Sequence, residues 1–225
     1  MKIDKEFAAL IPPLSADERQ QLEENIIEHG GARDPLVAWA SDDGLILLDG
    51  HNRYEICTRL GLPFDIHEVF LSSRYEAEDW IDRNQLGRRN LHPDAFMLLL
   101  GRRYNRAKKP HGGPRGASPQ NGDLKKTAQR IADEHGVSKN TVERAGKLIA
   151  AVAKLKAVDP QIETKVASGS GPARAAVVKA AAMLENDPRG AQDILDQKKK
   201  IADVVREEKR AAVVAKLEDV ATRKA

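Results

Sequence analysis

The segment KTAQRIADEHGVSKNTVERAGKL, residues 126–148, predicts two short helices that are joined by a tight turn. Ile131 and Ala132 lie at helical spacing in its first half. Gly136 then interrupts the apolar pattern, at a point where a residue without a Cβ takes the left-handed backbone conformation most easily. Ser138 follows as a candidate N-cap of the second helix. We therefore expect a compact helical corner in this segment.

The spacing of small and β-branched residues in the corner is typical of a DNA-binding helix-turn-helix, although an ordinary corner in an all-α core has the same pattern. Ala132 lets the two helices approach each other, Gly136 forms the turn, and Val142 packs the second helix on the first. Exposed polar side chains of such a second helix can bind phosphates and base edges. The predicted DNA contacts are Ser138, Lys139, Asn140, Thr141 and Arg144, with Lys125, Lys126 and Arg130 as phosphate anchors beside them.

The composition favours a helix-rich protein with one large or two small domains. Of the 225 residues, 32% are charged and only 4% are aromatic. The net charge of +3 is too small to indicate nucleic-acid binding, so the placement of the basic residues matters more than their sum. The single cysteine, Cys57, rules out an internal disulfide and a zinc site made of cysteines alone. Because the sequence shows neither a secretory leader nor an apolar run that could span a bilayer, we expect a cytoplasmic protein.

The order of the predicted elements indicates an α+β domain followed by helices only. Alternating apolar patterns predict a hairpin of two strands, at 35–40 and 45–48, and a further strand within 64–69. The first fourteen residues are expected to be extended, since Pro12-Pro13 disfavours a helix there. The predicted domains are an N-terminal domain (1–106), a flexible basic linker (107–123), a helix-turn-helix domain (124–186) and a long C-terminal amphipathic helix (187–225). That last helix could form a dimer seam or pack within the chain.

The stretch LLDGHNRYEICTRLG, residues 47–61, is the most distinctive part of the first domain. Gly50 lies between a predicted strand and a predicted helix, where the N–H groups of the first helical turn favour an anion. Arg53 adds a charge that can clamp a phosphate. A structural role, in which Arg53 pairs with Asp49, is an equal alternative.

Gly50, Arg53 and Tyr54, after an apolar strand, resemble the glycine-arginine box of the ParB N-terminal domain, a fold shared with sulfiredoxin. A helix-turn-helix follows this domain in ParB, as it does here. The resemblance extends over about residues 7–182. Its other matching segments are residues 22–26, 35–37, 77–81 and 84–93.

The resemblance implies both a DNA-binding and a nucleotide-binding function. ParB proteins bind centromere-like DNA sites through the helix-turn-helix, and many bind CTP with magnesium in the N-terminal domain. We therefore expect double-stranded DNA as a partner, a homodimer, and a partition ATPase as a further partner, in the partition or replication of a plasmid or mobile element. The implied nucleotide- or phosphate-binding residues are Gly50, His51, Asn52, Arg53, Asn84 and Arg88.

Three departures from the family pattern bear on catalysis. His51 and Asn52 stand where the family usually has a glutamate and an arginine, and Arg83 stands where a glutamate is implied to contact magnesium. A cation at that position repels a metal ion, so the sequence argues against magnesium dependence. His51 also occupies the place of the reactive cysteine of sulfiredoxin. We predict a protein without catalytic or metal-binding residues, and leave open a transcriptional regulator, a CTP hydrolase or a nuclease.

A group of basic residues before and within the predicted linker has two interpretations. It can be a surface that follows DNA phosphates, which would steepen the salt dependence of binding, or a solubilising face. The former is favoured because the residues come from separate segments. The group consists of Arg88, Arg89, Arg102, Arg103, Arg106, Lys108 and Lys109.

Overall fold

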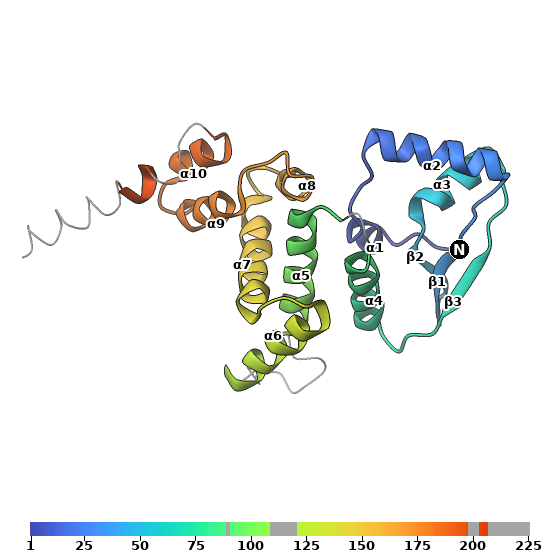
Figure 1. The fold of residues 1–225 in the computed structure, drawn as a ribbon, viewed down its shortest axis with the longest axis horizontal. Helices are drawn as coiled ribbons and strands as arrows, with labels where there is room; N and C mark the ends of the chain where they lie inside the picture. Colours follow the sequence, from blue (N-terminus) through green and yellow to red (C-terminus); the bar gives the residue numbers. More distant parts are fainter. Residues whose placement is uncertain (89–90, 109–120, 198–202, 207–225) are drawn as a thin grey trace, which may run out of the picture. The chain divides into compact units, whose positions relative to one another are not determined.

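The computed structural model describes residues 1–88, 91–108, 121–197 and 203–206, and only the backbone of 121–125. The chain forms two compact units, Met1–Leu91 and His92–Ala225 (Figure 1). The first contains a small sheet with helices and the second contains helices in the parts described, in agreement with the predicted α+β class. Most of the predicted linker, 109–120, lies outside the described residues.

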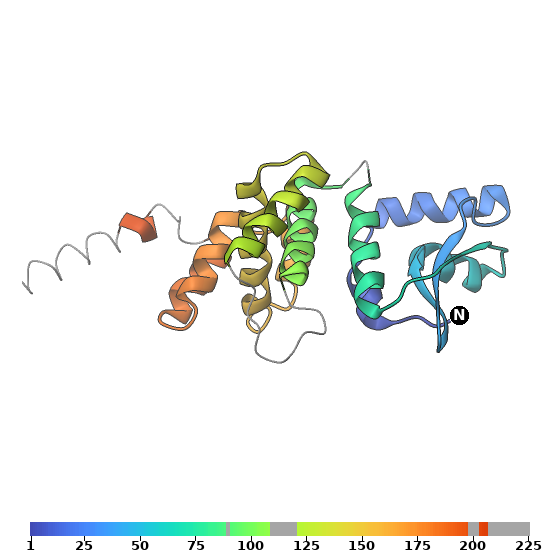
Figure 2. The ribbon, with the colours of Figure 1, turned by 90° about the horizontal axis from the view of Figure 1, so that it is seen from below.

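The first unit is built on a three-stranded sheet of order β2-β1-β3 (Figure 2). β1 and β2 pair antiparallel, with Ser41 opposite Gly44 at the turn, so the predicted hairpin is confirmed. β3 pairs parallel to β1 on the other side. The elements in chain order are α1 (Lys5–Ala9), α2 (Ala16–His29), β1 (Leu36–Ser41), β2 (Gly44–Asp49), α3 (His51–Leu60), β3 (Ile66–Val69) and α4 (Arg74–Leu86).

Two apolar clusters hold this unit together. One joins α1, β2 and α4 through the fully buried Phe7, Leu48 and Ile81, with Trp39 of β1 packed against them. The other joins α2 to α3 around Ile26, Ile56 and Cys57. The α2–α3 pair and the end of β2 thereby fix the start of α3, where the glycine-arginine box lies.

The N-terminal segment contains a short helix, α1, so the prediction of an extended entry is wrong. Asp4 caps this helix, because its Oδ1 accepts hydrogen bonds from the N–H groups of Glu6 (2.8 Å) and Phe7 (3.2 Å). The prolines at 12 and 13 follow the helix and therefore do not interfere with it. Burial of the whole Phe7 side chain supplies the tertiary contact that a single helical turn needs.

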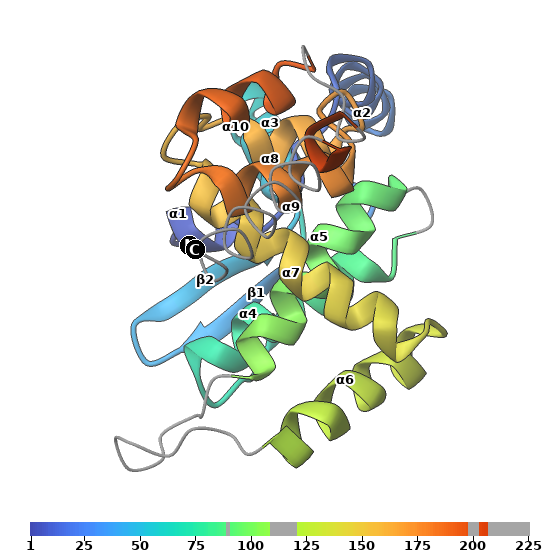
Figure 3. The same ribbon diagram turned by 90° about the vertical axis from the view of Figure 1, so that its left-hand side faces the viewer.

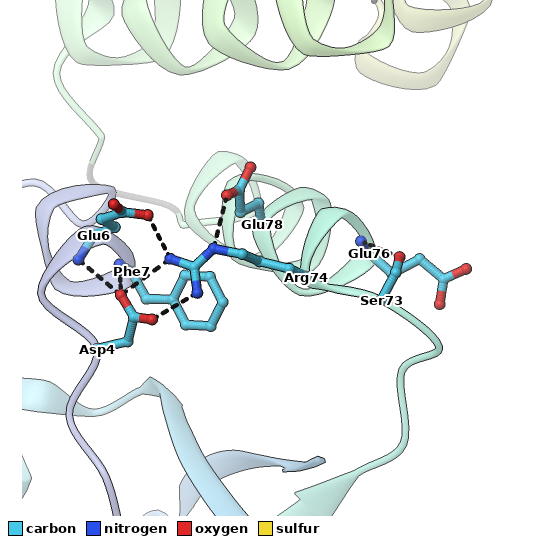
Figure 4. A network of polar contacts seen from close by, with 7 residues as sticks. All are labelled: Asp4, Glu6, Phe7, Ser73, Arg74, Glu76 and Glu78. Atoms are coloured by element: carbon cyan, nitrogen blue, oxygen red, sulfur yellow. Dashed lines mark hydrogen bonds and ion pairs between the residues drawn. The ribbon is translucent and has the colours of Figure 1, made fainter. Parts of the chain in front are cut away.

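Arg74 of α4 ties that helix to α1 (Figure 4). Its Nη1 donates to Asp4 Oδ2 (2.6 Å) and its Nη2 to Glu6 Oε2 (2.6 Å). The guanidinium carbon lies 4.3 Å from the centroid of the Phe7 ring, a cation–π distance. The hydrogen bonds from Arg74 lower the pKa of Asp4 to about 2, against a smaller opposing effect of burial.

We expect the Asp4–Arg74 pair to make stability fall in acid. The carboxyl group of Asp4 has a pKa of about 2 in the folded chain, against an ordinary value of 3.8. The contribution of its charge to the stability of the fold is therefore complete above pH 3.8 and is lost as the pH falls through about 2. Because both partners are partly exposed, we expect Asp4→Asn to lower the free energy of unfolding by about 1 kcal/mol at pH 7. Asparagine caps a helix as well as aspartate does, so this substitution isolates the ion pair. Urea titrations at pH 7 and pH 2 should give a much smaller difference at the lower pH, where about half of the folded molecules carry a protonated Asp4. A constant difference would contradict the assignment.

The second unit consists of helices packed around α7 in the part that the structure describes. α5 lies along α7, and Asn105 Nδ2 of α5 donates to the carbonyl oxygen of Gly146 (2.8 Å). α9 packs against both α7 and α10. The elements are α5 (Pro93–Ala107), α6 (Asn121–His135), α7 (Lys139–Leu155), α8 (Ile162–Ala167), α9 (Arg174–Met183) and α10 (Pro188–Leu195).

The place of α5 differs from the predicted domain boundary. The sequence predicts residues 93–106 as the end of the N-terminal domain, whereas the structure places α5 in the second compact unit. The reason is its wide apolar face, with Leu98, Leu99 and Leu100 all buried. A helix with such a face needs another helix to cover it, and α7 does so.

The C-terminal segment departs from the predicted single helix. Asp187 caps α10 by accepting from the N–H of Gly190 (2.8 Å), and Pro188 occupies its first turn. α10 ends at Leu195, and Gln197 takes a φ of 59°, a left-handed conformation that stops a helix. The prediction of one long helix over 187–225 is therefore wrong in its first part, while residues 207–225 lie outside the described part. None of the described helices combines the length and apolar character that a membrane crossing requires.

Candidate functional site

A cavity of about 660 Å³ lies in the first unit where β2 ends and α3 begins. It brings together all six residues that the resemblance implies for nucleotide or phosphate binding: Gly50, His51, Asn52, Arg53, Asn84 and Arg88. The remaining lining residues, which were not predicted, are Ile11, Leu14, Glu18, Leu22, Asp49, Arg83 and Gly87.

Gly50 shapes the floor of this cavity. Its φ of 92° is a conformation that residues with a side chain rarely adopt, and an added Cβ would lie only 2.6 Å from Leu36 Cδ2. Gly50 is also the N-cap of α3, and within residues 1–88 no side chain caps that helix. The first N–H groups of α3 therefore remain as donors at the cavity, with the positive end of the helix dipole behind them.

Asp49 holds two guanidinium groups at the cavity. Arg53 Nη2 donates to its Oδ2 (3.1 Å), and Arg88 Nη2 donates to its Oδ1 (3.0 Å). The structural alternative from the sequence, an Arg53–Asp49 pair, is thus present. These ion pairs leave further N–H donors of Arg53 and Arg88 available to a ligand, because a guanidinium has five such donors and both side chains line the cavity. Three arginines, Arg53, Arg83 and Arg88, line the cavity together with two carboxylates, Glu18 and Asp49, and Asp34 Oδ2 lies 3.7 Å from Arg53 Nη1.

His51 is the unpaired polar group of the cavity. Both of its ring nitrogens are buried, and neither has a hydrogen-bond partner among the described residues. Burial lowers the pKa of His51, with Asp49 opposing the shift, so the ring is neutral at pH 7 and offers one donor and one acceptor. A buried polar group without a partner needs an explanation, and a bound ligand or water is the usual one.

Arg83 is a third arginine of the cavity. Its Nε lies 2.8 Å from Asp79 Oδ2. Among the described residues, no group of three or more histidines, cysteines, aspartates or glutamates is arranged to hold a metal ion. The guanidinium groups and the N–H groups at the start of α3 therefore suit a phosphate-bearing ligand.

The predicted corner lies in the second unit, where α6 leads through a tight turn into α7 (Figure 3). Gly136 takes a φ of 63°, and the Val137 N–H donates to the carbonyl oxygen of Ala132 (3.0 Å). Ser138 caps α7, since its Oγ accepts from the N–H of Thr141 (3.1 Å). Ala132 and Val142 are fully buried, as the spacing requires. Both helices are longer than predicted, as α6 begins at Asn121 and α7 ends at Leu155.

The structure separates the predicted contacts of α7 into occupied and available side chains. The hydroxyl groups of Ser138 and Thr141 bond to each other (2.9 Å), and Lys139 lies 3.6 Å from Glu143 Oε1. Asn140 and Arg144 are exposed.

The predicted phosphate anchors lie on α6. Lys126 is exposed, while Arg130 Nη1 donates to Glu134 Oε1 (2.5 Å). The side chain of Lys125 lies outside the described residues.

Lys147 is a candidate contact that was missed. It is exposed, and within the described ranges Asn140, Arg144 and Lys147 have neither an ion pair nor a side-chain hydrogen bond. The spacing of the three residues, i, i+4 and i+7, was visible in the sequence as one face of a helix.

Several described members of the basic group are engaged in contacts with other residues of their own unit. Arg102 Nη2 donates to Glu163 Oε1 (2.7 Å), and Arg88 is engaged by Asp49. Arg103 is only 1% exposed and lies inside the second unit. Its Nη1 is 2.7 Å from His135 Nε2, and its Nη2 is 2.5 Å from Glu134 Oε2. The contacts of Arg102 and Arg103 stabilise the second unit. Arg89 and Lys109 lie outside the described residues.

The geometry defines a class of protein: an α+β unit with an arginine-lined cavity at the glycine-capped start of α3, followed in the chain by a helical unit with an exposed helical corner. Neither family models nor curated proteins match the sequence. Solved structures do match. A pNOB8-like ParB N-domain in its C2221 form has a TM-score of 0.54 at 20% identity, over 92% of this chain and 84% of that chain. A second pNOB8-like ParB N-domain has a TM-score of 0.50 at 19% identity, over 82% of this chain and 72% of that one. The chain therefore has a ParB-like fold.

Proposed function

We propose that the chain is a sequence-specific DNA-binding protein of the ParB type, which acts in the partition or replication of a plasmid or mobile element. The observation that carries this proposal is the stripe of Asn140, Arg144 and Lys147 on α7, exposed and without partners among the described residues. Such side chains on the second helix of a corner are available to base edges and phosphates. The ParB-like fold supports the assignment.

The proposal includes a dimer and leaves a role in transcription as the alternative. Helix-turn-helix proteins read two half-sites, which a homodimer presents by symmetry. A transcriptional regulator would use the same DNA chemistry without a partition ATPase. Co-purification with such an ATPase, encoded beside this chain, would favour partition.

DNA binding is tested by selecting duplexes from a random library with the full chain. For the selected duplex we expect Asn140→Ala with Arg144→Ala to weaken binding about 100-fold, and for a random duplex only a few-fold, because base contacts carry the discrimination. Arg189→Ala is the matched control: it removes an exposed arginine of α10 and should change neither affinity. Enrichment of no sequence, or equal losses on both duplexes, would reject the proposed function.

We infer in addition that the cavity at α3 binds a phosphate-bearing ligand, for which CTP is the first candidate. His51, Arg53 and Arg88 support this inference, since they offer an unpaired buried imidazole and two guanidinium groups around free helical N–H groups. The arginines and the N–H groups would hold phosphate oxygens, and His51 would take a hydrogen bond from or to the ligand.

Arg53→Ala is expected to weaken CTP binding about 30-fold, the cost of one charge-assisted bidentate contact. Calorimetry with and without magnesium should give similar affinities for the parent chain. Arg59→Ala is the control, because Arg59 lies on the same helix, pairs with Glu23 (2.6 Å) and does not line the cavity. Equal affinities of the Arg53→Ala variant and the parent would contradict the inference. Phosphate release that depends on Arg53 would establish the hydrolase alternative instead.

A further inference from the structure

The contacts within α7 divide its polar side chains into two groups. Ser138 and Thr141 bond to each other at the cap, and Lys139 is paired with Glu143. Their polar atoms already serve the start of the helix. Asn140 and Arg144 have no such bond among the described residues, so they can form hydrogen bonds with a ligand at no cost to the fold.

The face that carries these two residues is turned away from the core. Val142, Ala145 and Gly146 are buried on the opposite side, where Gly146 meets Asn105 of α5. An α-helix turns about 100° per residue, so Asn140, Arg144 and Lys147 fall within a sector of about 60°. The stripe begins at the second residue of α7, and the N-terminal residues of a recognition helix are those that reach base edges.

The chemistry of the two side chains differs in a way that DNA can distinguish. An asparagine amide matches the N6 donor and N7 acceptor of adenine, and an arginine guanidinium matches O6 and N7 of guanine. Arg144 follows Asn140 by four residue steps, a rise of about 6 Å along the helix, which is close to two base-pair steps of about 3.4 Å.

We propose that α7 reads an adenine through Asn140 and a guanine through Arg144, about two base-pair steps apart in the major groove, while Lys147 contacts a phosphate. This inference rests on the proposed function and specifies which bases the site contains. Asn140 and Arg144 are thus specificity-determining residues, and Lys147 contributes affinity alone.

The test uses the full chain and the duplex selected from the random library. At the predicted pair, adenine is replaced by 7-deazaadenine, or guanine by 7-deazaguanine, which removes the N7 acceptor and leaves Watson–Crick pairing intact. Each replacement should weaken binding of the parent about 10-fold. Asn140→Ala should abolish the effect of 7-deazaadenine and keep that of 7-deazaguanine, and Arg144→Ala should show the reverse.

Lys147→Ala should weaken binding equally on all duplexes and reduce the slope of log K against log salt by about 1. Lys154→Ala, at the far end of α7 and 3.7 Å from Glu185, is the charge control and should leave that slope unchanged. Circular dichroism melts serve to check that each variant is folded. A selected site without this purine pair, or variants that keep the parent's sensitivity to both analogues, would overturn the base assignment while DNA binding stands. Failure to select any site would reject the proposed function and the assignment with it.

Discussion

Gly101→Ala is expected to lower the free energy of unfolding of the second unit by about 3 kcal/mol. Gly101 lies where α5 crosses α7, and a Cβ there would overlap the carbonyl oxygen of Ala145 and lie 2.5 Å from its carbonyl carbon. Backbone atoms cannot rotate away as a side chain does, so the helices must separate and lose packing along their length. Alanine is the better helix former by about 1 kcal/mol, and this gain offsets only part of the loss.

Thermal unfolding followed by circular dichroism measures this effect. Gly87→Ala is the matched control, because an added Cβ there would meet its nearest atoms at 3.5 and 3.6 Å, an ordinary contact distance. We expect the control to unfold within about 3 °C of the parent and Gly101→Ala to unfold roughly 15 °C lower. Similar midpoints for the two variants would show that α5 and α7 are not in backbone contact.

Arg103→Met is expected to cost about 2 kcal/mol and to weaken DNA binding as well. Removing one partner of a buried ion pair usually costs more, but Glu134 keeps partial access to solvent and a second partner in Arg130. Burial raises the pKa of Glu134, yet the hydrogen bonds from Arg103 and Arg130 outweigh it and hold the pKa below the usual value. Arg103 also contacts His135, the last residue of α6, so it fixes the end of the helix that precedes the turn.

Arg130→Met provides the control for this substitution. It removes the exposed partner of the same Glu134 and should change stability by less than about 0.5 kcal/mol. Chemical unfolding of both variants compares the two partners of Glu134. The affinity of Arg103→Met for the selected duplex, at a temperature where this variant is folded, separates stability from positioning. Equal effects of the two substitutions on stability would mean that the buried guanidinium of Arg103 has no special part in placing α6.

Much of the first unit follows from short-range patterns. The strands of the hairpin alternate along the sequence, and a glycine between a strand and a helix predicts the start of α3. Ser15 and Glu18, three residues apart, form a capping box at the start of α2, and both of its reciprocal hydrogen bonds are present. α1 was missed because its five residues depend on Phe7 and on Arg74, which is 70 positions from Asp4.

The sequence likewise predicted some residues of the candidate site but not the contacts between them. Local spacing indicated Gly50, Arg53 and the polar positions of α7, while the other predicted cavity residues came from the resemblance to ParB. Local spacing did not predict that Asp49 would hold both Arg53 and Arg88, because that contact joins residues 39 positions apart.

The sequence by itself determined local features of this protein, such as the turn at Gly136 and the cap at Ser138. These depend on backbone preferences and on hydrogen bonds within a few residues. Only the tertiary structure decided which distant parts meet: α5 belongs with α7, Arg103 is buried, and His51 has no partner among the described residues. Burial and ion pairing depend on which distant faces meet, and a one-dimensional pattern records the character of a face without recording what covers it.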